Sequence, residues 1–114
     1  MRNDGLVLLQ QIENKHLLKA LIRQLNKDVA LSGLNFELKE EASAKEVVAE
    51  LQSHLYSMIS DDFGSYLNFL YRVDIPEKKI KSIDETDTRL IVQIVTQLVL
   101  EREWQKVWFK SKNR

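Results

Sequence analysis

The sequence contains no cysteine. This absence excludes a disulfide framework, a thiolate zinc site, a redox pair and a cysteine nucleophile. Basic and acidic side chains balance at 17 each, whereas nucleic-acid-binding domains usually carry a basic excess, so a surface devoted to polyanions is not indicated. No apolar run reaches the roughly 20 residues of a membrane-spanning helix, and the run from Leu6 to Leu9 is too short for a signal-peptide core. We therefore expect a soluble, cytoplasmic protein.

Turn-forming residues are also scarce, with three glycines and one proline in 114 residues. So few turn-forming residues favour a small number of long helices. The length suits one domain, and the 44% apolar and 30% charged residues are close to the globular average. We predict a single all-α domain over residues 1–114, a helical bundle of three long helices plus one short connecting helix.

The first long helix is predicted from the apolar spacing. From Leu17 onward, apolar residues recur every three or four positions until Gly33, which is suited to end a helix. Leu9 and Ile12 lie on the opposite side of the same helical wheel. Either a separate short helix ends near Asn14, or one helix contacts different partners along its length.

The segment after this helix alternates apolar and polar residues at Leu34, Phe36 and Leu38. A lone strand has no partner within the chain. We predict an extended loop from about Ser32 to Ala42 that packs these three side chains on the bundle. Strand pairing across a dimer is the alternative.

The second long helix begins at a capping box formed by Ser43 and Glu46. Its apolar residues keep one helical phase beyond Gly64, and a glycine in a helix costs only about 1 kcal/mol relative to alanine. We predict one helix up to about Arg72. A break at Asp61 is the second choice.

A short helix is predicted after Pro76, because proline ends the preceding helix and suits a first turn. Asp74 is the expected N-cap and Glu77 follows at the third position. The helix is expected to end near Ser82.

The last long helix is predicted from about Glu85 to about Phe109, with Glu85 and Arg89 pairing across one turn. This helix is apolar on nearly all sides, so it is either central in the bundle or covered by a partner. Because three long helices hardly enclose one of their own number, we expect a homodimer across it. The candidate partner or dimer face comprises Val92, Val99, Leu100, Trp104, Val107 and Trp108.

Sequence motifs for catalysis are missing. His16 and His54 are the two imidazoles, and a helical metal site at His54 would need Glu50, Asp61 or Asp62 as neighbours. Such sites usually add ligands from a second helix as Glu-x-x-His motifs, and the chain has none. It also lacks a glycine-rich phosphate loop and a G-x-S-x-G elbow. We predict no enzyme activity, no metal, no cofactor and no small-molecule substrate.

The C-terminal run EREWQKVWFKSKNR has five basic and two acidic residues. Cations in a last turn complement the helix dipole, and residues 110–114 are expected to fray. The alternative is contact with nucleic acid or another anionic surface. The candidate residues for that contact are Lys106, Lys110, Lys112 and Arg114.

The stretch YLNFLYRVDIPEKKIKS mixes aromatic and basic residues, as in platforms for single-stranded nucleic acid. Apolar residues at core spacing thread the same stretch. We therefore prefer a structural corner built by Tyr71, Arg72 and Asp74, with Asp74 and later acids as partners of Arg72.

Two blocks, DDFGSYLNFLYRVDIPEKKI and LVLEREWQKV, resemble a family of short, uncharacterised bacterial all-helical proteins. The blocks cover about a quarter of the chain. The resemblance implies a helical fold and no particular activity. The matching residues are Asp62, Phe63, Leu70, Tyr71, Arg72, Asp74, Arg102, Glu103, Trp104, Gln105 and Lys106.

These patterns together predict a small non-catalytic module for protein–protein interaction or scaffolding, one that self-associates. The alternative function is weak binding of nucleic acid or an anionic surface through the basic, aromatic C-terminal tail.

Overall fold

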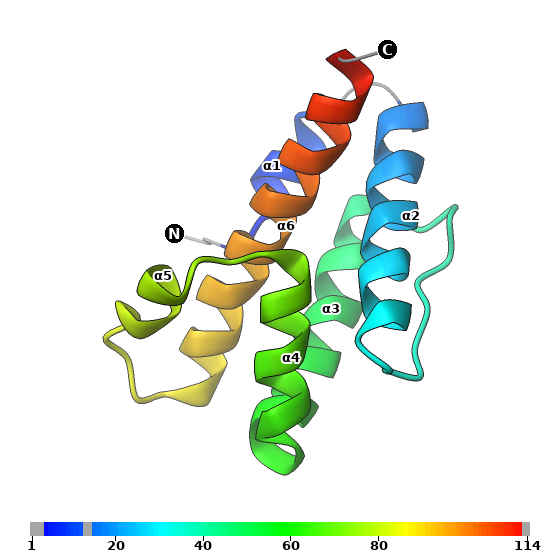
Figure 1. The fold of residues 1–114 in the computed structure, drawn as a ribbon. Coiled ribbons are helices and arrows are strands. Elements are labelled where there is room, and N and C mark those ends of the chain that lie inside the picture. Colours follow the sequence, from blue (N-terminus) through cyan, green and yellow to red (C-terminus); the bar gives the residue numbers. More distant parts are fainter. Residues whose placement is uncertain (1–3, 13–14, 113–114) are drawn as a thin grey trace.

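The structure, a computed structural model, describes residues 4–12 and 15–112. All regular secondary structure in these two ranges is helical, which confirms the all-α class (Figure 1). Three long helices and one short helix were expected, whereas the described residues form six helices. They are α1 (Leu6–Gln10), α2 (Lys15–Leu31), α3 (Ala44–Asp61), α4 (Phe63–Val73), α5 (Glu77–Lys81) and α6 (Thr88–Lys112).

One additional helix comes from the N-terminal segment. Of the two possibilities for Leu9 and Ile12, the separate short helix is the observed one, and it ends at Gln10. The expected end near Asn14 lies outside the described residues. Leu9 is buried in the core, so α1 is an integral part of the bundle.

The other additional helix arises because the predicted continuous second helix breaks at Asp62. The backbone of Asp62 leaves the helical region at φ −154° and ψ 72°, and its side chain caps α4 by accepting hydrogen bonds from the backbone N–H and the hydroxyl of Ser65. The apolar phase continues across the break because both helices bury residues against the same core. An apolar pattern that keeps one helical phase therefore does not require one unbroken helix. The alternative prediction, a break at Asp61, is closer to the structure.

Local end signals elsewhere are confirmed. Ser43 and Glu46 form both hydrogen bonds of the capping box. Gly33 ends α2 at φ 78°, with its N–H donating to Ala30 O and the next N–H donating to Val29 O. A glycine tolerates this left-handed conformation without a steric penalty.

The segment from Leu34 to Leu38 is an extended loop held on the bundle, as predicted. The Asn26 side chain donates to Leu38 O at 2.8 Å and accepts from Leu38 N at 2.9 Å. The Phe36 ring stacks on His54 of α3 with centroids 3.8 Å apart. These contacts replace the backbone ladder of a strand.

The segment between α4 and α6 differs from prediction in its caps and ion pairs. Asp74 has φ 76° and caps the C-terminus of α4, whereas Pro76 occupies the N-cap of α5 without a side-chain hydrogen bond. Arg89 lies 3.9 Å from Asp87 rather than pairing with Glu85. Helix α6 then starts at Thr88 and continues to Lys112, so residues 110–112, expected to fray, are helical.

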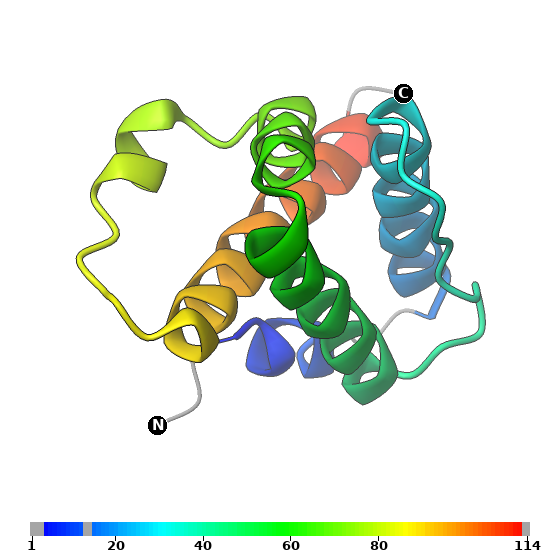
Figure 2. The same ribbon diagram turned by 90° about the horizontal axis from the view of Figure 1, so that it is seen from below.

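Helix α6 crosses the molecule between α1, α2, α3 and α4, all of which contact it (Figure 2). Its apolar character on nearly all sides is therefore explained within one chain. The premise that one chain hardly encloses α6 does not hold, because the predicted second long helix is two helices, α3 and α4, and α1 adds a further contact. None of the helices in the described residues is long and apolar enough to cross a membrane.

Candidate functional site: a buried charge cluster beneath a basic groove

The candidate dimer face on α6 is mostly inside the bundle. Val92, Val99, Leu100 and Val107 are buried against other helices of the same chain. These four side chains offer little surface to a second protein, since the most exposed of them, Val107, is 6% exposed. This part of the prediction is corrected, because α6 is the central helix.

The two tryptophans of that face remain near the surface. Their ring centroids are 6.0 Å apart, Trp104 is partly buried, and Trp108 is half exposed with Lys112 Nζ 4.9 Å from its ring centroid. Together with Leu8 of α1, the following residues Gln11 and Ile12, and Leu17 of α2, they line a hollow of about 370 Å³. The basic tail thus partly covers its own aromatic residues.

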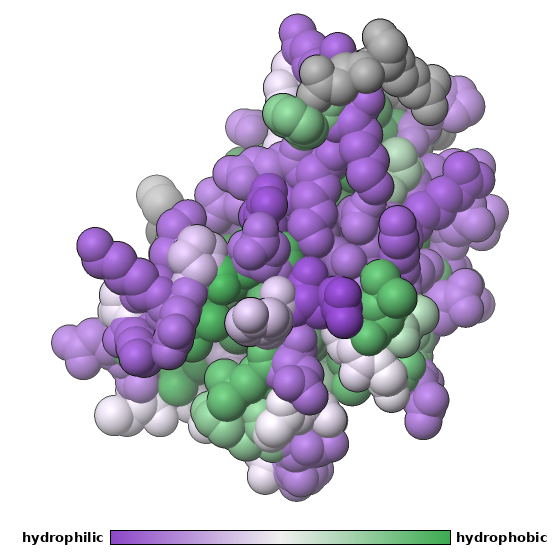
Figure 3. All heavy atoms as spheres, in the orientation of Figure 1, coloured by the Kyte–Doolittle hydropathy of each residue, from purple (hydrophilic) through white to green (hydrophobic). Residues whose placement is uncertain are grey.

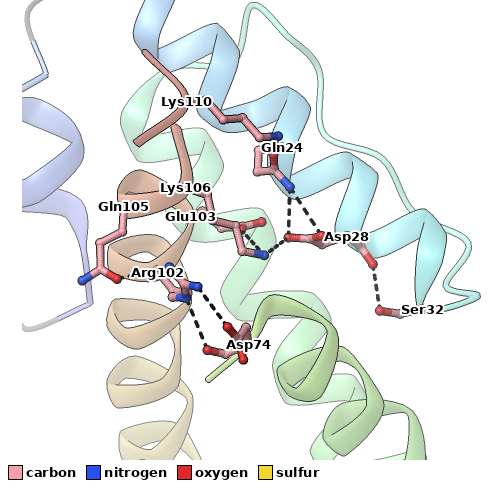
Figure 4. Close-up of polar contacts among 9 residues, drawn as sticks. All are labelled: Gln24, Asp28, Ser32, Asp74, Arg102, Glu103, Gln105, Lys106 and Lys110. Atoms are coloured by element: carbon pink, nitrogen blue, oxygen red, sulfur yellow. Dashed lines mark hydrogen bonds and ion pairs between the residues drawn. The ribbon is translucent and has the colours of Figure 1, made fainter. Parts of the chain in front are cut away.

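The predicted corner at Tyr71, Arg72 and Asp74 takes a different form. Tyr71 is 86% exposed and packs no helix end. Asp74 pairs with Arg102 of α6, whose Nη2 lies 2.9 Å from Asp74 Oδ2 and whose Nε donates to Asp74 O at 3.3 Å (Figure 4). The corner is therefore held by Arg102, and Arg72 is not part of it.

The candidate anion contacts are also separated by the fold. Lys106 points into the bundle, Lys110 Nζ donates to Gln24 Oε1 of α2 at 2.6 Å, and Lys112 lies over the Trp108 ring. Arg114 lies outside the described residues. Lys106 is thus removed from the anion site, and Lys110 is placed in a groove that the sequence did not indicate.

A cluster of buried charged groups joins α2 to α6 (Figure 4). Lys106 Nζ lies 2.8 Å from Asp28 Oδ2 and 3.3 Å from Glu103 Oε1. Asp28 is 4% exposed and Glu103 is fully buried. Gln24 Nε2 reaches both oxygens of Asp28 at 3.5 Å, which is a weak contact. One lysine is therefore shared between two buried carboxyl groups.

The pKa of Glu103 is raised to about 8, first by burial and then by the neighbouring Asp28, with Lys106 acting in the opposite direction. Neither carboxyl oxygen of Glu103 has a hydrogen-bond partner among the described residues, so the ion pair with Lys106 at 3.3 Å compensates only part of the water lost by its charged form. At neutral pH the cluster therefore holds one cation, one anion and a protonated Glu103. Its net charge is then zero.

We expect Glu103→Gln to remove a pH dependence of stability. The folded pKa of Glu103 lies above its ordinary value of 4.5, so the folded chain holds this proton in a range where the unfolded chain has released it. Stability from this group is thus fully present below the ordinary pKa and is lost as pH rises toward about 8. Between pH 5 and pH 7 the free energy of unfolding should fall by about 2–3 kcal/mol more in the parent than in the variant.

Urea denaturation at the two pH values measures this difference. Glu101→Gln is the matched control, because Glu101 is exposed on the same helix. Equal pH slopes for the parent and Glu103→Gln would show that Glu103 is ionised in the folded chain.

A groove of about 600 Å³ lies next to this cluster, between α2 and the last turns of α6. Side chains at turn spacing along α2 form one wall, and Lys110 and Ser111 belong to the other. None of the described residues that line it is acidic. These residues are His16, Leu17, Ala20, Arg23, Gln24, Lys27, Val107, Lys110 and Ser111.

An exposed apolar stripe runs along α4. Phe63, Leu67 and Tyr71, four residues apart and therefore on one side of the helix, are 55%, 42% and 86% exposed. Hydrophobic atoms gather over the lower part of α4, whereas the surface over the upper parts of α2 and α6 is mainly hydrophilic (Figure 3).

Neither the groove nor the cluster is predicted from the sequence, which places Phe63 and Leu67 in the apolar phase of the second long helix and Tyr71 in the structural corner. The spacing of four from Phe63 to Tyr71 marked one helix side, but helical phase alone did not say that this side faces water. Asp28 and Glu103 both interrupt apolar helix positions, and a carboxylate at a core position is a usable signal for a buried pair. The pairing of Asp28 with Lys106 could not be identified, because the two residues lie 78 positions apart in the sequence.

His54, considered earlier as a metal ligand, stacks on Phe36, and burial lowers its pKa. No group of three or more His, Asp and Glu residues suited to a metal ion occurs in residues 4–12 and 15–112.

No family model, curated protein or solved structure matches the chain. The resemblance to uncharacterised bacterial proteins therefore stays a prediction.

Proposed function

We propose that this chain is a small, non-catalytic interaction module that self-associates through α4. The stripe of Phe63, Leu67 and Tyr71 carries this proposal. Given their exposed fractions, the three side chains present on the order of 300–400 Å² of largely apolar surface. Patches of that size on small proteins are frequently used for binding.

The stripe is symmetric about its centre, which favours a second copy of the chain as the partner. Leu67 has one aromatic residue four positions before it, Phe63, and another four positions after it, Tyr71. If two copies pair antiparallel about Leu67, each Phe63 meets a Tyr71 of the other copy. Such a twofold arrangement covers both ends of the stripe with one contact set.

The backbone of α4 is open to close approach on this side. A Cβ atom added to Gly64 would have only Asp62 Oδ1 near it, at 3.9 Å.

Because the area of the stripe is well below the roughly 800 Å² per partner of a standard stable interface, the dimer should be weak, with a dissociation constant in the micromolar range or above.

The burial of the charged cluster supports a non-catalytic role. A catalytic acid or base must reach the reacting group of a substrate. Asp28, Glu103 and Lys106 do not line the groove beside them, and the protonated Glu103 has no exposed surface. Their arrangement suits a structural role in joining α2 to α6.

Sedimentation over a concentration series tests self-association. The parent should shift from monomer to dimer between about 10 and 500 µM. Leu67→Lys should abolish the shift, because it places a charge at the centre of the apolar contact. Leu90→Lys is the matched control, since Leu90 is also 42% exposed but lies on α6.

The end of the stripe gives a second variant. Tyr71→Glu should weaken the dimer, and Tyr56→Glu, at an exposed tyrosine of α3, should not. A parent that is strictly monomeric at 500 µM, or equal effects of Leu67→Lys and Leu90→Lys, would contradict the proposal.

A further inference from the structure

We infer that the groove between α2 and α6 is a binding site for a small organic anion with an apolar part, such as a phosphate monoester. This inference does not depend on self-association through α4. The groove lies beside the last turns of α6, which run alongside α2 in both ribbon views (Figures 1 and 2).

The charge of the groove is the first argument. Arg23, Lys27 and Lys110 line it, and none of its other described lining residues is acidic. Arg23 is paired with Glu40, with its Nε 2.6 Å from Glu40 Oε1. Within residues 4–12 and 15–112, Lys27 forms no ion pair and Lys110 contacts only a neutral amide. The two lysines, on opposite walls, therefore carry charge that no carboxylate of these residues compensates.

The cluster behind the groove does not cancel this charge. Lys106 is occupied by Asp28 and lies close to Glu103, which is protonated at neutral pH. Gln24 connects the two regions, since it accepts from Lys110 and donates to Asp28. Because Lys106 and Asp28 neutralise each other, the positive charge that faces the groove comes from Lys27 and Lys110.

The size and floor of the groove are the second argument. About 600 Å³ falls in the range of small-molecule sites, which combine apolar surface with a few polar groups. Leu17, Ala20 and Val107 provide the apolar surface. Gln24 and Ser111 add neutral hydrogen-bonding groups. A ligand with an anionic group and a small ring or alkyl group matches both features.

Nuclear magnetic resonance titration with phenyl phosphate tests the inference. Saturable shifts should centre on the backbone amides of Leu17, Ala20 and Val107. Inorganic phosphate should bind more weakly because it lacks the ring, and benzyl alcohol should not bind because it lacks the charge.

A double variant, Lys27→Gln with Lys110→Gln, should raise the dissociation constant for phenyl phosphate by about tenfold or more, because two charge-assisted contacts are lost. The matched control is Lys78→Gln with Lys79→Gln on α5, which removes the same charge elsewhere and should change binding less than about twofold. Circular dichroism of both double variants should retain the helical spectrum of the parent.

Three results would overturn the inference. One is no saturable shift with phenyl phosphate up to about 10 mM. Another is an equal loss of binding in the two double variants, which would indicate a diffuse charge effect. The third is tighter, steeply salt-dependent binding of a single-stranded oligonucleotide, which would assign the surface to nucleic acid.

Discussion

Lys106→Met should lower the free energy of unfolding by about 3–5 kcal/mol at neutral pH, because it leaves a buried carboxylate without its cation. In the parent, Lys106 Nζ is 2.8 Å from Asp28 Oδ2. Asp28 is 4% exposed, and its remaining side-chain partner, Gln24, lies 3.5 Å away. Methionine fills a volume similar to the lysine stem but supplies no charge, so the loss reports the electrostatic interaction.

Urea denaturation measures this effect, and two further variants identify its cause. Lys110→Met removes an exposed lysine of the same helix and should cost less than about 1 kcal/mol. Adding Asp28→Asn to Lys106→Met should recover much of the lost stability, since a buried pair replaced at both ends leaves no unpaired charge. A loss below about 1 kcal/mol in Lys106→Met would show that water reaches the carboxylate.

Gly5→Ala should destabilise the fold by about 3–4 kcal/mol, a large effect for the addition of one methyl group. Gly5 is the N-cap of α1 with φ 94°, a conformation that is costly for a residue with a Cβ atom. That Cβ would lie 2.7 Å from Cδ1 and 3.3 Å from Cβ of Leu100. Leu100 is fully buried in α6, so it has little room to move away.

Gly33→Ala separates the two contributions. Gly33 also has a positive φ, 78°, but nothing lies within 4 Å of the added Cβ. Its loss should be only about 1–2 kcal/mol, the backbone cost alone. The difference between the variants, measured from urea midpoints, therefore reports how tightly the N-terminal segment packs on α6. Equal losses would mean that this contact relaxes freely.

The packing at Gly5 is supported by nearby hydrogen bonds. Asp4 is buried, accepting from the Leu6 N–H at 3.1 Å and from Gln52 Nε2 of α3 at 3.1 Å. The first described residues of the chain are thus tied to two helices. In the sequence this segment looked like a short apolar run with no defined role.

The sequence by itself determined the helical class and several helix ends. Few glycines and prolines and apolar spacing of three and four are properties of the chain alone. The capping box at Ser43 and the glycine end at Gly33 depend on hydrogen bonds between residues close in sequence. Such local interactions are visible without knowledge of the fold.

Only the tertiary structure decided which sides of the helices are buried. Periodicity defines an apolar side but not what covers it, so α6 looked like a dimer surface until α1 and α4 were found against it. The same limit hid the exposed stripe of α4 and the break at Asp62, because the helical phase is the same on both sides of that break.

Only the fold, likewise, separated the charges of the C-terminal run. Lys106 and Lys110 are one turn apart, yet Lys106 is partly buried beside Asp28 and Lys110 lines the groove with Lys27. The residues that decide these roles are on α2, far away in the sequence. The sequence shows which residues are charged. Which of those charges face water depends on how helices distant in the sequence pack against one another.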